Sequence, residues 1–188
     1  MPPCPPPTHI LKVTTLQRTE IAPTVVDRWS QAGRLYALVD ACDQPAVPIR
    51  CRETDPGSAR SLYRGRAEEE LWAIAPYLYR VDADTLGWIR EVLWDEPWGA
   101  LVLSGAGFEA LYRHFRRFLI IESPTNESWY FRFYDPRVLS SYLAAPEVDL
   151  PGFFGPVDAF AIGRPDRSCE LLWQRIGDRH VSLGGALR

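Results

Sequence analysis

Several features on which a function could be built are scarce or missing in this sequence of 188 residues. Lys12 is the only lysine and the formal net charge is −3, so no basic excess is present to displace counterions from nucleic acid. No apolar run is long enough to span a membrane, and the proline-rich opening does not resemble an export signal. We therefore expect a cytoplasmic protein without nucleic-acid or membrane partners.

The cysteines show no pattern of a metal centre. They are Cys4, Cys42, Cys51 and Cys169. No two of them form a Cys-x-x-Cys pair, and none has a histidine at ligand spacing, so we expect no metal site. A reducing cytoplasm also disfavours disulfides, and free thiols are expected.

The most constrained stretch spans residues 129–139 and reads as an aromatic strand that runs directly into a helix. By the two-residue period of a strand, its aromatic residues expected on one face are Trp129, Phe131 and Phe133. Asp135 suits the N-cap of the helix, because its carboxylate can accept hydrogen bonds from free amides. Pro136 suits the first helical position, where a missing amide hydrogen costs nothing. We take Asp135 and Pro136 as a structural junction.

Strands and helices alternate along the chain, which predicts an α/β (α+β mixed) fold: a central mixed sheet flanked by helices, with a small C-terminal β-containing extension. The expected strands lie near residues 35–41, 76–81, 98–104, 119–122 and 129–134. Residues 42–60 are expected to form an irregular connection. The predicted organisation is a proline-rich N-terminal tail and lead-in (1–20), a core α/β domain (21–145) and a C-terminal extension (146–188).

No set of residues suited to catalysis stands out. Ser104-Gly105-Ala106-Gly107 lies between a predicted strand and helix, where a phosphate-binding loop would be, but it lacks the remaining residues of the known fingerprints. Two glycines also suit a tight strand-to-helix turn. His9, His114 and His180 are expected at the surface. We therefore expect no enzyme, no catalytic residues and no cofactor.

Tryptophan and arginine suggest a different kind of site, since the two together are typical of protein-binding hot spots. Trp94 and Trp98 bracket a short acidic loop, where at least one of them is expected to be exposed. Arg132 either pairs with a carboxylate of the scaffold or presents its guanidinium group to a partner. The candidate protein-binding residues are Trp94, Trp98, Arg113, Arg116, Arg117, Arg132 and Arg137.

Over residues 34–160 the chain resembles a known family. The segments that carry the resemblance include Leu35–Asp40, Leu62-Tyr63-Arg64-Gly65, Leu111–Arg117, Phe131–Leu139 and Phe153–Val157. They are similar to the bacterial family called domain of unknown function 4123. The resemblance implies an adaptor chaperone of type VI secretion, which holds a toxic effector and helps to load it onto the VgrG spike.

From this resemblance we expect a protein without enzymatic activity whose partners are a VgrG spike protein and a cognate secreted effector. Two alternatives remain open. One is an immunity protein for a neighbouring toxin, and the other is a small phosphate- or nucleotide-binding enzyme that uses the turn at 104–107.

Overall fold

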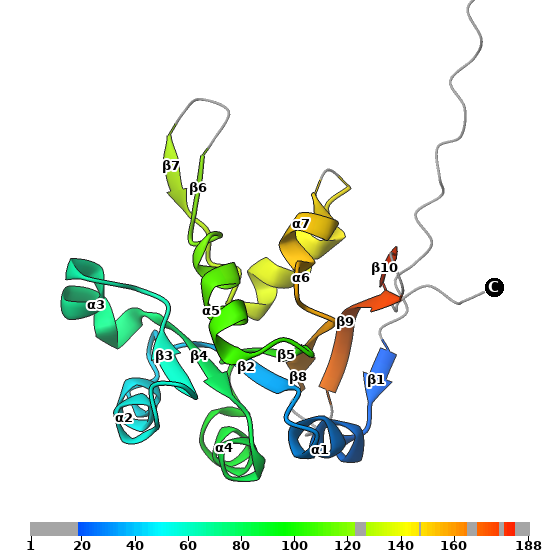
Figure 1. Cartoon of the computed structure of the whole chain (residues 1–188), viewed down its shortest axis with the longest axis horizontal. Coiled ribbons are helices and arrows are strands. Elements are labelled where there is room, and N and C mark those ends of the chain that lie inside the picture. The colour runs from blue at the N-terminus through cyan, green and yellow to red at the C-terminus, as the bar shows by residue number, and fades with distance from the viewer. Residues whose placement is uncertain (1–18, 123–126, 147, 165–168, 177–178, 183–188) are drawn as a thin grey trace, which may run out of the picture.

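A central β-sheet with helices on both of its faces forms the body of the protein (Figure 1). This computed structural model describes residues 19–122, 127–146, 148–164, 169–176 and 179–182. The proline-rich tail predicted at the N-terminus lies almost wholly outside these residues, and the predicted domain limits stay predictions. Among the described residues, no helix is long and apolar enough to cross a membrane.

The central sheet has the strand order β1-β9-β8-β5-β2-β4-β3, with β10 paired to β9. Its strands are β1 (Thr19–Ile21), β2 (Leu35–Asp40), β3 (Ala59–Ser61), β4 (Pro76–Arg80), β5 (Gly99–Leu103), β8 (Ala159–Gly163), β9 (Cys169–Ile176) and β10 (Arg179–Ser182). All six residues of β2 are buried, because β2 lies between β4 and β5 and is covered on both faces. The predicted α/β class is confirmed.

The sheet differs from the prediction in the direction of its strands, since every pairing in the described residues is antiparallel and the expected mixed sheet is not found. Asp40, the last residue of β2, lies opposite Pro76, the first residue of β4. Strand β4 therefore begins at the edge of the sheet where β2 ends, and the connection between them does not return to the opposite edge as it would between parallel strands. The C-terminal extension continues this sheet through β8 and β9 and is not a separate lobe.

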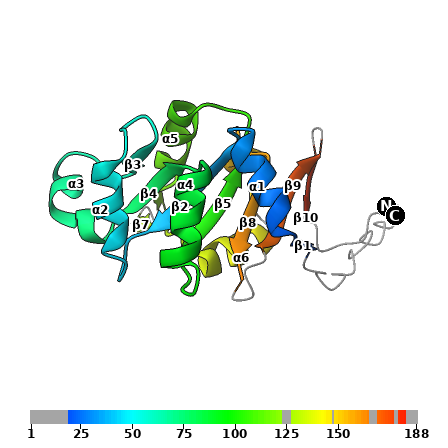
Figure 2. The ribbon, with the colours of Figure 1, turned by 90° about the horizontal axis from the view of Figure 1, so that it is seen from below.

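The helices divide between the two faces of the sheet. Helices α1 (Pro23–Gln31), α2 (Ala46–Glu53) and α4 (Ala83–Trp88) cover the face seen in Figure 2, with α4 continuing as a π-helical turn, Ile89–Leu93. Helices α5 (Phe108–Arg116), α6 (Pro136–Ala144) and α7 (Leu150–Phe154) cover the other face, and α3 (Arg66–Leu71) lies near β3 (Figure 1). The prediction of an irregular connection at 42–60 is wrong, because α2 and most of β3 form there.

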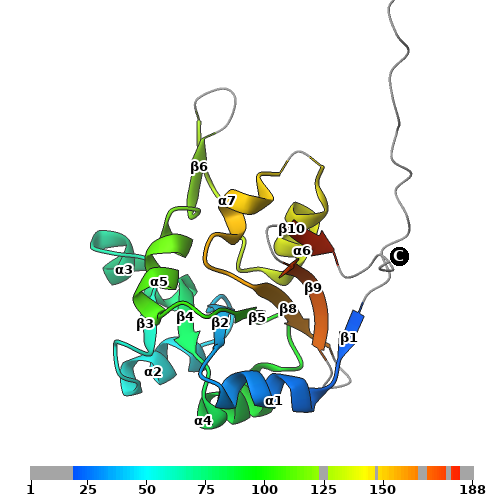
Figure 3. The same cartoon turned by 45° about the vertical axis from the view of Figure 1, so that its right-hand side comes forward.

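Strands β6 (Ile120–Glu122) and β7 (Ser128–Tyr130) form a separate two-stranded hairpin that projects away from the central sheet (Figures 1 and 3). The prediction placed both strands in the central sheet and extended the second to residue 134, which is wrong on both counts. Strand β7 ends at Tyr130, and the chain then turns inward. Phe133 is fully buried while Trp129 is exposed, so the expected common face of alternate aromatic residues does not exist.

An aromatic core fills the space between the sheet and helices α5 to α7. Phe133 is at its centre, stacked on Phe115 at 5.7 Å between ring centroids and in edge contact with Phe153 at 6.0 Å. Phe153 in turn stacks on Phe160 of β8 at 5.6 Å. The segment between β7 and α6 is therefore part of the core and joins the helical layer to the sheet.

Gly99 is required where β5 begins beside β2. Its φ of +150° is one that side-chain-bearing residues rarely adopt, and a Cβ atom there would lie 1.9 Å from the carbonyl oxygen of Leu38. Only a residue without a side chain allows this close approach of the two central strands.

Candidate protein-binding surface

The junction before α6 has the structure that the sequence predicts. Asp135 is the N-cap and its Oδ1 accepts a hydrogen bond from the amide of Arg137 at 2.9 Å, while Pro136 occupies the start of the helix. Arg137 also donates through Nε and Nη2 to the two carboxylate oxygens of Asp135, at 3.0 and 2.6 Å. These hydrogen bonds from Arg137 lower the pKa of the Asp135 carboxyl. Asp135 and Pro136 thus have the structural role expected of them.

Arg132 pairs with a carboxylate of the scaffold. Its Nη2 lies 2.5 Å from Oδ2 of Asp40, a buried residue at the end of β2, and Oδ1 of Asp40 accepts from the amide of Cys42 at 3.0 Å. The hydrogen bond to Asp40 raises the pKa of Arg132 above its ordinary value. The ion pair connects the segment after β7 to the central sheet. The side chain of Arg132 keeps nearly half of its surface exposed, so contact with a partner is compatible with this role.

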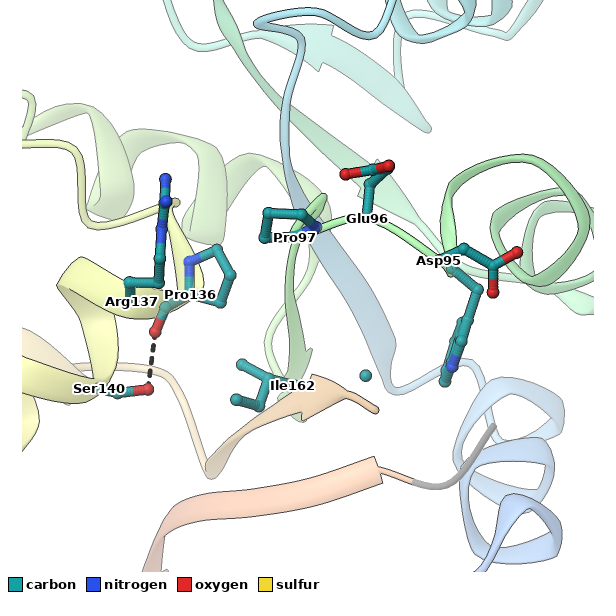
Figure 4. A pocket seen from close by; sticks show the side chains of 9 residues that line it. Asp95, Glu96, Pro97, Pro136, Arg137, Ser140 and Ile162 are labelled. Atoms are coloured by element: carbon teal, nitrogen blue, oxygen red, sulfur yellow. Dashed lines mark hydrogen bonds between the residues drawn. The ribbon is translucent and has the colours of Figure 1, made fainter. Parts of the chain in front are cut away.

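Two adjoining cavities lie beside these arginines. One, of about 230 Å³, is lined by both ion pairs, and the other, of about 450 Å³, is lined by Trp94, the loop after it, Ile162 of β8 and the start of α6. Figure 4 shows the larger cavity, with Pro136, Arg137 and Ser140 on one side and Asp95 to Pro97 on the other. The two cavities share Glu96, Pro97 and Arg137. They border one another at these residues, and we call the two together the hollow beside α6, which has an apolar wall and charged edges.

The expectation that Trp94 or Trp98 is exposed is wrong. Both side chains are buried, with 3% of the surface of each residue accessible, and the indole Nε1 of Trp94 donates to the carbonyl of Arg164 at 2.6 Å. Their rings contact each other at 6.1 Å between centroids, and Trp98 directly precedes β5. The indole of Trp94 can be buried here because its NH group has a hydrogen-bond acceptor, the carbonyl of Arg164. Neither residue presents a protruding anchor to another protein.

The arginines at the end of α5 are on the surface, as expected of them. Arg113 and Arg117 are exposed, and Arg116 is partly buried and donates to the carbonyl of Leu62 at 3.0 Å. His114, expected at the surface, is buried instead. Helix α5 turns this residue toward α7, where its Nε2 lies 2.7 Å from the carbonyl oxygen of Phe153.

The contacts of His114 define its protonation. A guanidinium group can only donate, so the 2.8 Å contact from Arg117 makes Nδ1 an acceptor and leaves the proton on Nε2 for Phe153. Burial lowers the pKa of His114, in agreement with a neutral ring. Gly155 approaches this ring closely, since a Cβ atom there would lie 2.5 Å from Cε1 of His114. His114 is therefore a structural link between α5 and α7.

Polar groups of the turn at 104–107 already form hydrogen bonds within the protein. The amide of Gly105 donates to Oδ2 of Asp158 at 3.1 Å, and the hydroxyl of Ser104 donates to the carbonyl of Pro156 at 2.6 Å. A carboxylate thus lies where a phosphate group would have to bind, and its charge disfavours an anion. Arg34 pairs with the same carboxylate oxygen at 2.9 Å. The arrangement fits a turn that fastens the start of α5 to β8.

The hairpin carries an exposed apolar surface that the sequence analysis missed. The exposed fractions are 56% for Ile120, 37% for Ile121, 54% for Trp129 and 52% for Tyr130. Two strands of three residues each cannot shield the large side chains on both of their faces. The sequence gives no sign that the second strand ends at Tyr130, because an aromatic run followed by a helix reads equally well as core. We call these four residues the hairpin patch.

A third cavity, of about 240 Å³, lies at the root of the hairpin. Its walls include Ile120 and Tyr130 of the hairpin patch, Tyr63, and the arginines Arg64 and Arg117. The rings of Tyr63 and Tyr130 meet edge to face at 5.7 Å. Of the predicted binding residues, only Arg116 and Arg117 contribute to this cavity, whereas Trp94, Arg132 and Arg137 line the hollow beside α6.

The fold and these surfaces define an α/β protein with an antiparallel central sheet and an exposed apolar hairpin. A family model described as Domain of unknown function (DUF4123) matches residues 35–149, from the start of β2 to the residue before α7. The chain belongs to this family. Comparisons with curated proteins and with solved structures gave no match.

Proposed function

We propose that this protein is a cytoplasmic adaptor of type VI secretion that binds a toxic effector and loads it onto a VgrG spike. The observation that carries the proposal is the hairpin patch, in which four large apolar side chains stand in solvent on a projecting element. About half of the surface of Trp129 and of Tyr130 is left in water there, so these side chains add little to the stability of the protein itself. Contact with another protein would bury them, and buried aromatic residues supply much of the binding energy of interfaces.

The family membership supports the same proposal, because all but one of the segments named for the resemblance to adaptor chaperones lie in the matched region. An adaptor must contact two partners at once. The hairpin root and the hollow beside α6 share no lining residue, so they can serve as two separate contact surfaces. The arginines around each surface would orient the partners, while apolar contacts would provide affinity.

The proposal is tested by purifying the tagged protein from cells that also express the neighbouring spike and toxin genes. We expect both partners to co-purify with the wild-type protein. The variant Trp129→Ser should lose one of them. Ile49→Ser is the matched control, because Ile49 is also 54% exposed but lies on α2, on the other face of the sheet. Recovery of neither partner by the wild-type protein would refute the proposal.

Deletion of the gene separates an adaptor from an immunity protein. Loss of toxin secretion with no effect on the growth of the producing cells is expected for an adaptor. Killing of those cells by their own toxin would instead identify an immunity protein.

A further inference from the structure

The cavity at the root of the hairpin combines an apolar wall with charges of one sign. Its charged lining residues are Arg64, Arg116 and Arg117, and among the side chains that the structure describes no carboxylate contributes to its wall. Burial raises the pKa of Tyr63 and of Tyr130 to about 12, so both phenols stay neutral near pH 7 and do not offset the positive charge.

The three arginines make no ion pair with a carboxylate anywhere in the described ranges. Arg64 and Arg116 lie over the ring of Tyr112, at 5.8 and 5.7 Å from its centroid, and Arg117 lies over Phe118. Neighbouring arginines behave differently. Arg60 pairs with Glu109 at 2.6 Å and Arg66 with Glu70 at 2.7 Å, whereas no described side chain supplies a carboxylate to the arginines of this cavity.

The cavity is also continuous with the hairpin patch, because Ile120 and Tyr130 belong to both. Ile120 and Tyr130 are paired across the hairpin and share the face that borders the cavity, so a partner that covers this pair also passes over the arginines. An occupant that matches both halves needs a large apolar side chain for the cavity and carboxylates for the guanidinium groups around it. A free phosphate would meet the charges but leave the apolar wall exposed to water.

We infer that the hairpin root binds an acidic amphipathic segment of a partner protein, with an apolar side chain in the cavity and Asp or Glu carboxylates on Arg64 and Arg117. The inference rests on the proposed function in taking another polypeptide as the occupant. It adds the chemistry by which that polypeptide is recognised.

The test places a photo-reactive benzoylphenylalanine at position 120 of the full chain, in cells that express the neighbouring toxin and spike genes. A second protein carries the same group at position 49, where the native isoleucine has nearly the same exposure but lies on α2. After irradiation, the cross-linked segment is identified by mass spectrometry. We expect position 120 alone to cross-link, to a segment in which Asp or Glu flanks a large apolar residue.

Charge variants then test the role of the arginines. Arg64→Glu should lower the cross-linking yield about fivefold, because it turns an exposed attraction into a repulsion. Arg28→Glu is the control, since Arg28 is exposed on α1, far from the hairpin in Figure 1. Replacing the acidic residue of the cross-linked partner by arginine should restore the yield with Arg64→Glu, which a variant that merely unfolds could not show.

The outcomes distinguish this inference from the proposed function. Cross-links to segments without acidic residues, to lipid, or to a second copy of the chain would overturn the inference. A cross-linking yield that is unchanged in Arg64→Glu would also overturn it. If toxin and spike co-purify but position 120 does not cross-link, the inference fails and the function stands. If neither toxin nor spike co-purifies but position 120 cross-links to an acidic segment of another protein, with the same dependence on Arg64, the function fails and the inference stands.

Discussion

Removal of the Arg132 side chain should destabilise the whole domain, because its partner Asp40 is buried at the end of β2. In Arg132→Ala the carboxylate of Asp40 keeps only the amide of Cys42 as a hydrogen-bond donor among its described contacts. Breaking a buried ion pair costs about 3–5 kcal/mol. An exposed pair is worth at most about 1 kcal/mol. The side chains here are 46% and 9% exposed, which places this pair between the two limits.

We therefore expect Arg132→Ala to lower the free energy of unfolding by about 2 kcal/mol. With a urea m-value of about 2.5 kcal/mol/M, the unfolding midpoint should fall by roughly 0.8 M. The assay is urea unfolding followed by tryptophan fluorescence at pH 7. The matched control is Arg66→Ala, whose pair with Glu70 is exposed on α3 and should contribute less than about 0.5 kcal/mol.

A double-mutant cycle with Asp40→Asn separates the pair from other effects of each substitution. If the two side chains act together, Asp40→Asn/Arg132→Ala should be about 1 kcal/mol more stable than the sum of the single variants predicts. Two results would refute the argument that this pair connects the junction to the sheet. One is additive effects of the two substitutions. The other is an unfolding free energy of Arg132→Ala within about 0.5 kcal/mol of the wild-type value, which is the limit expected for the control.

The remaining predictions concern the aromatic core, the α5–α7 contact and the hairpin. Phe133→Ala should cost about 3–5 kcal/mol in urea unfolding, because the fully buried ring is at the centre of the aromatic core; a loss below 1 kcal/mol (about one methylene) would contradict that placement. The folded-state pKa of His114 lies below its ordinary value of 6.5, so stability should be constant above about pH 7 and fall as the pH drops through 6.5 toward the folded pKa. His114→Gln should show a weaker fall over this range in the same unfolding measurement. Gly155→Ala should lower the melting temperature through the close contact with His114 and a φ of +48°, and an unchanged value would show that the chain relaxes there at no cost. Trp129→Ser should change the unfolding free energy by less than about 0.5 kcal/mol, since Trp129 is 54% exposed, and should nevertheless lose one of the two co-purified partners.

The parts of the fold that sequence reasoning found were those with strong local signals. Strands β2, β4 and β5 are short apolar runs between turns, and α6 begins at an Asp-Pro pair that suits an N-cap and first helical position. Each of these signals is local. The direction of strand pairing depends instead on how the connections cross the sheet, which no local pattern reports.

The errors around residues 129–134 have one physical cause. A period of two identifies alternate residues, but it cannot tell whether the chain continues straight. Here the chain leaves the hairpin after Tyr130 and enters the core, so Trp129 and Phe133 have opposite environments. Trp94, Trp98 and His114 were misplaced for a related reason, since their burial comes from α7, β8 and the segment after it, which are distant in sequence.

The central claim is that the hairpin patch is the contact surface for a protein partner, and it is tested most directly by the affinities of the purified toxin and the purified spike for this protein. Isothermal titration of each partner into the wild-type protein, Trp129→Ser and Ile49→Ser compares two residues of equal exposure on opposite faces of the sheet. The account predicts that Trp129→Ser weakens the binding of one partner by about tenfold or more while Ile49→Ser leaves both affinities unchanged. Affinities for both partners that are equal in all three proteins would contradict it.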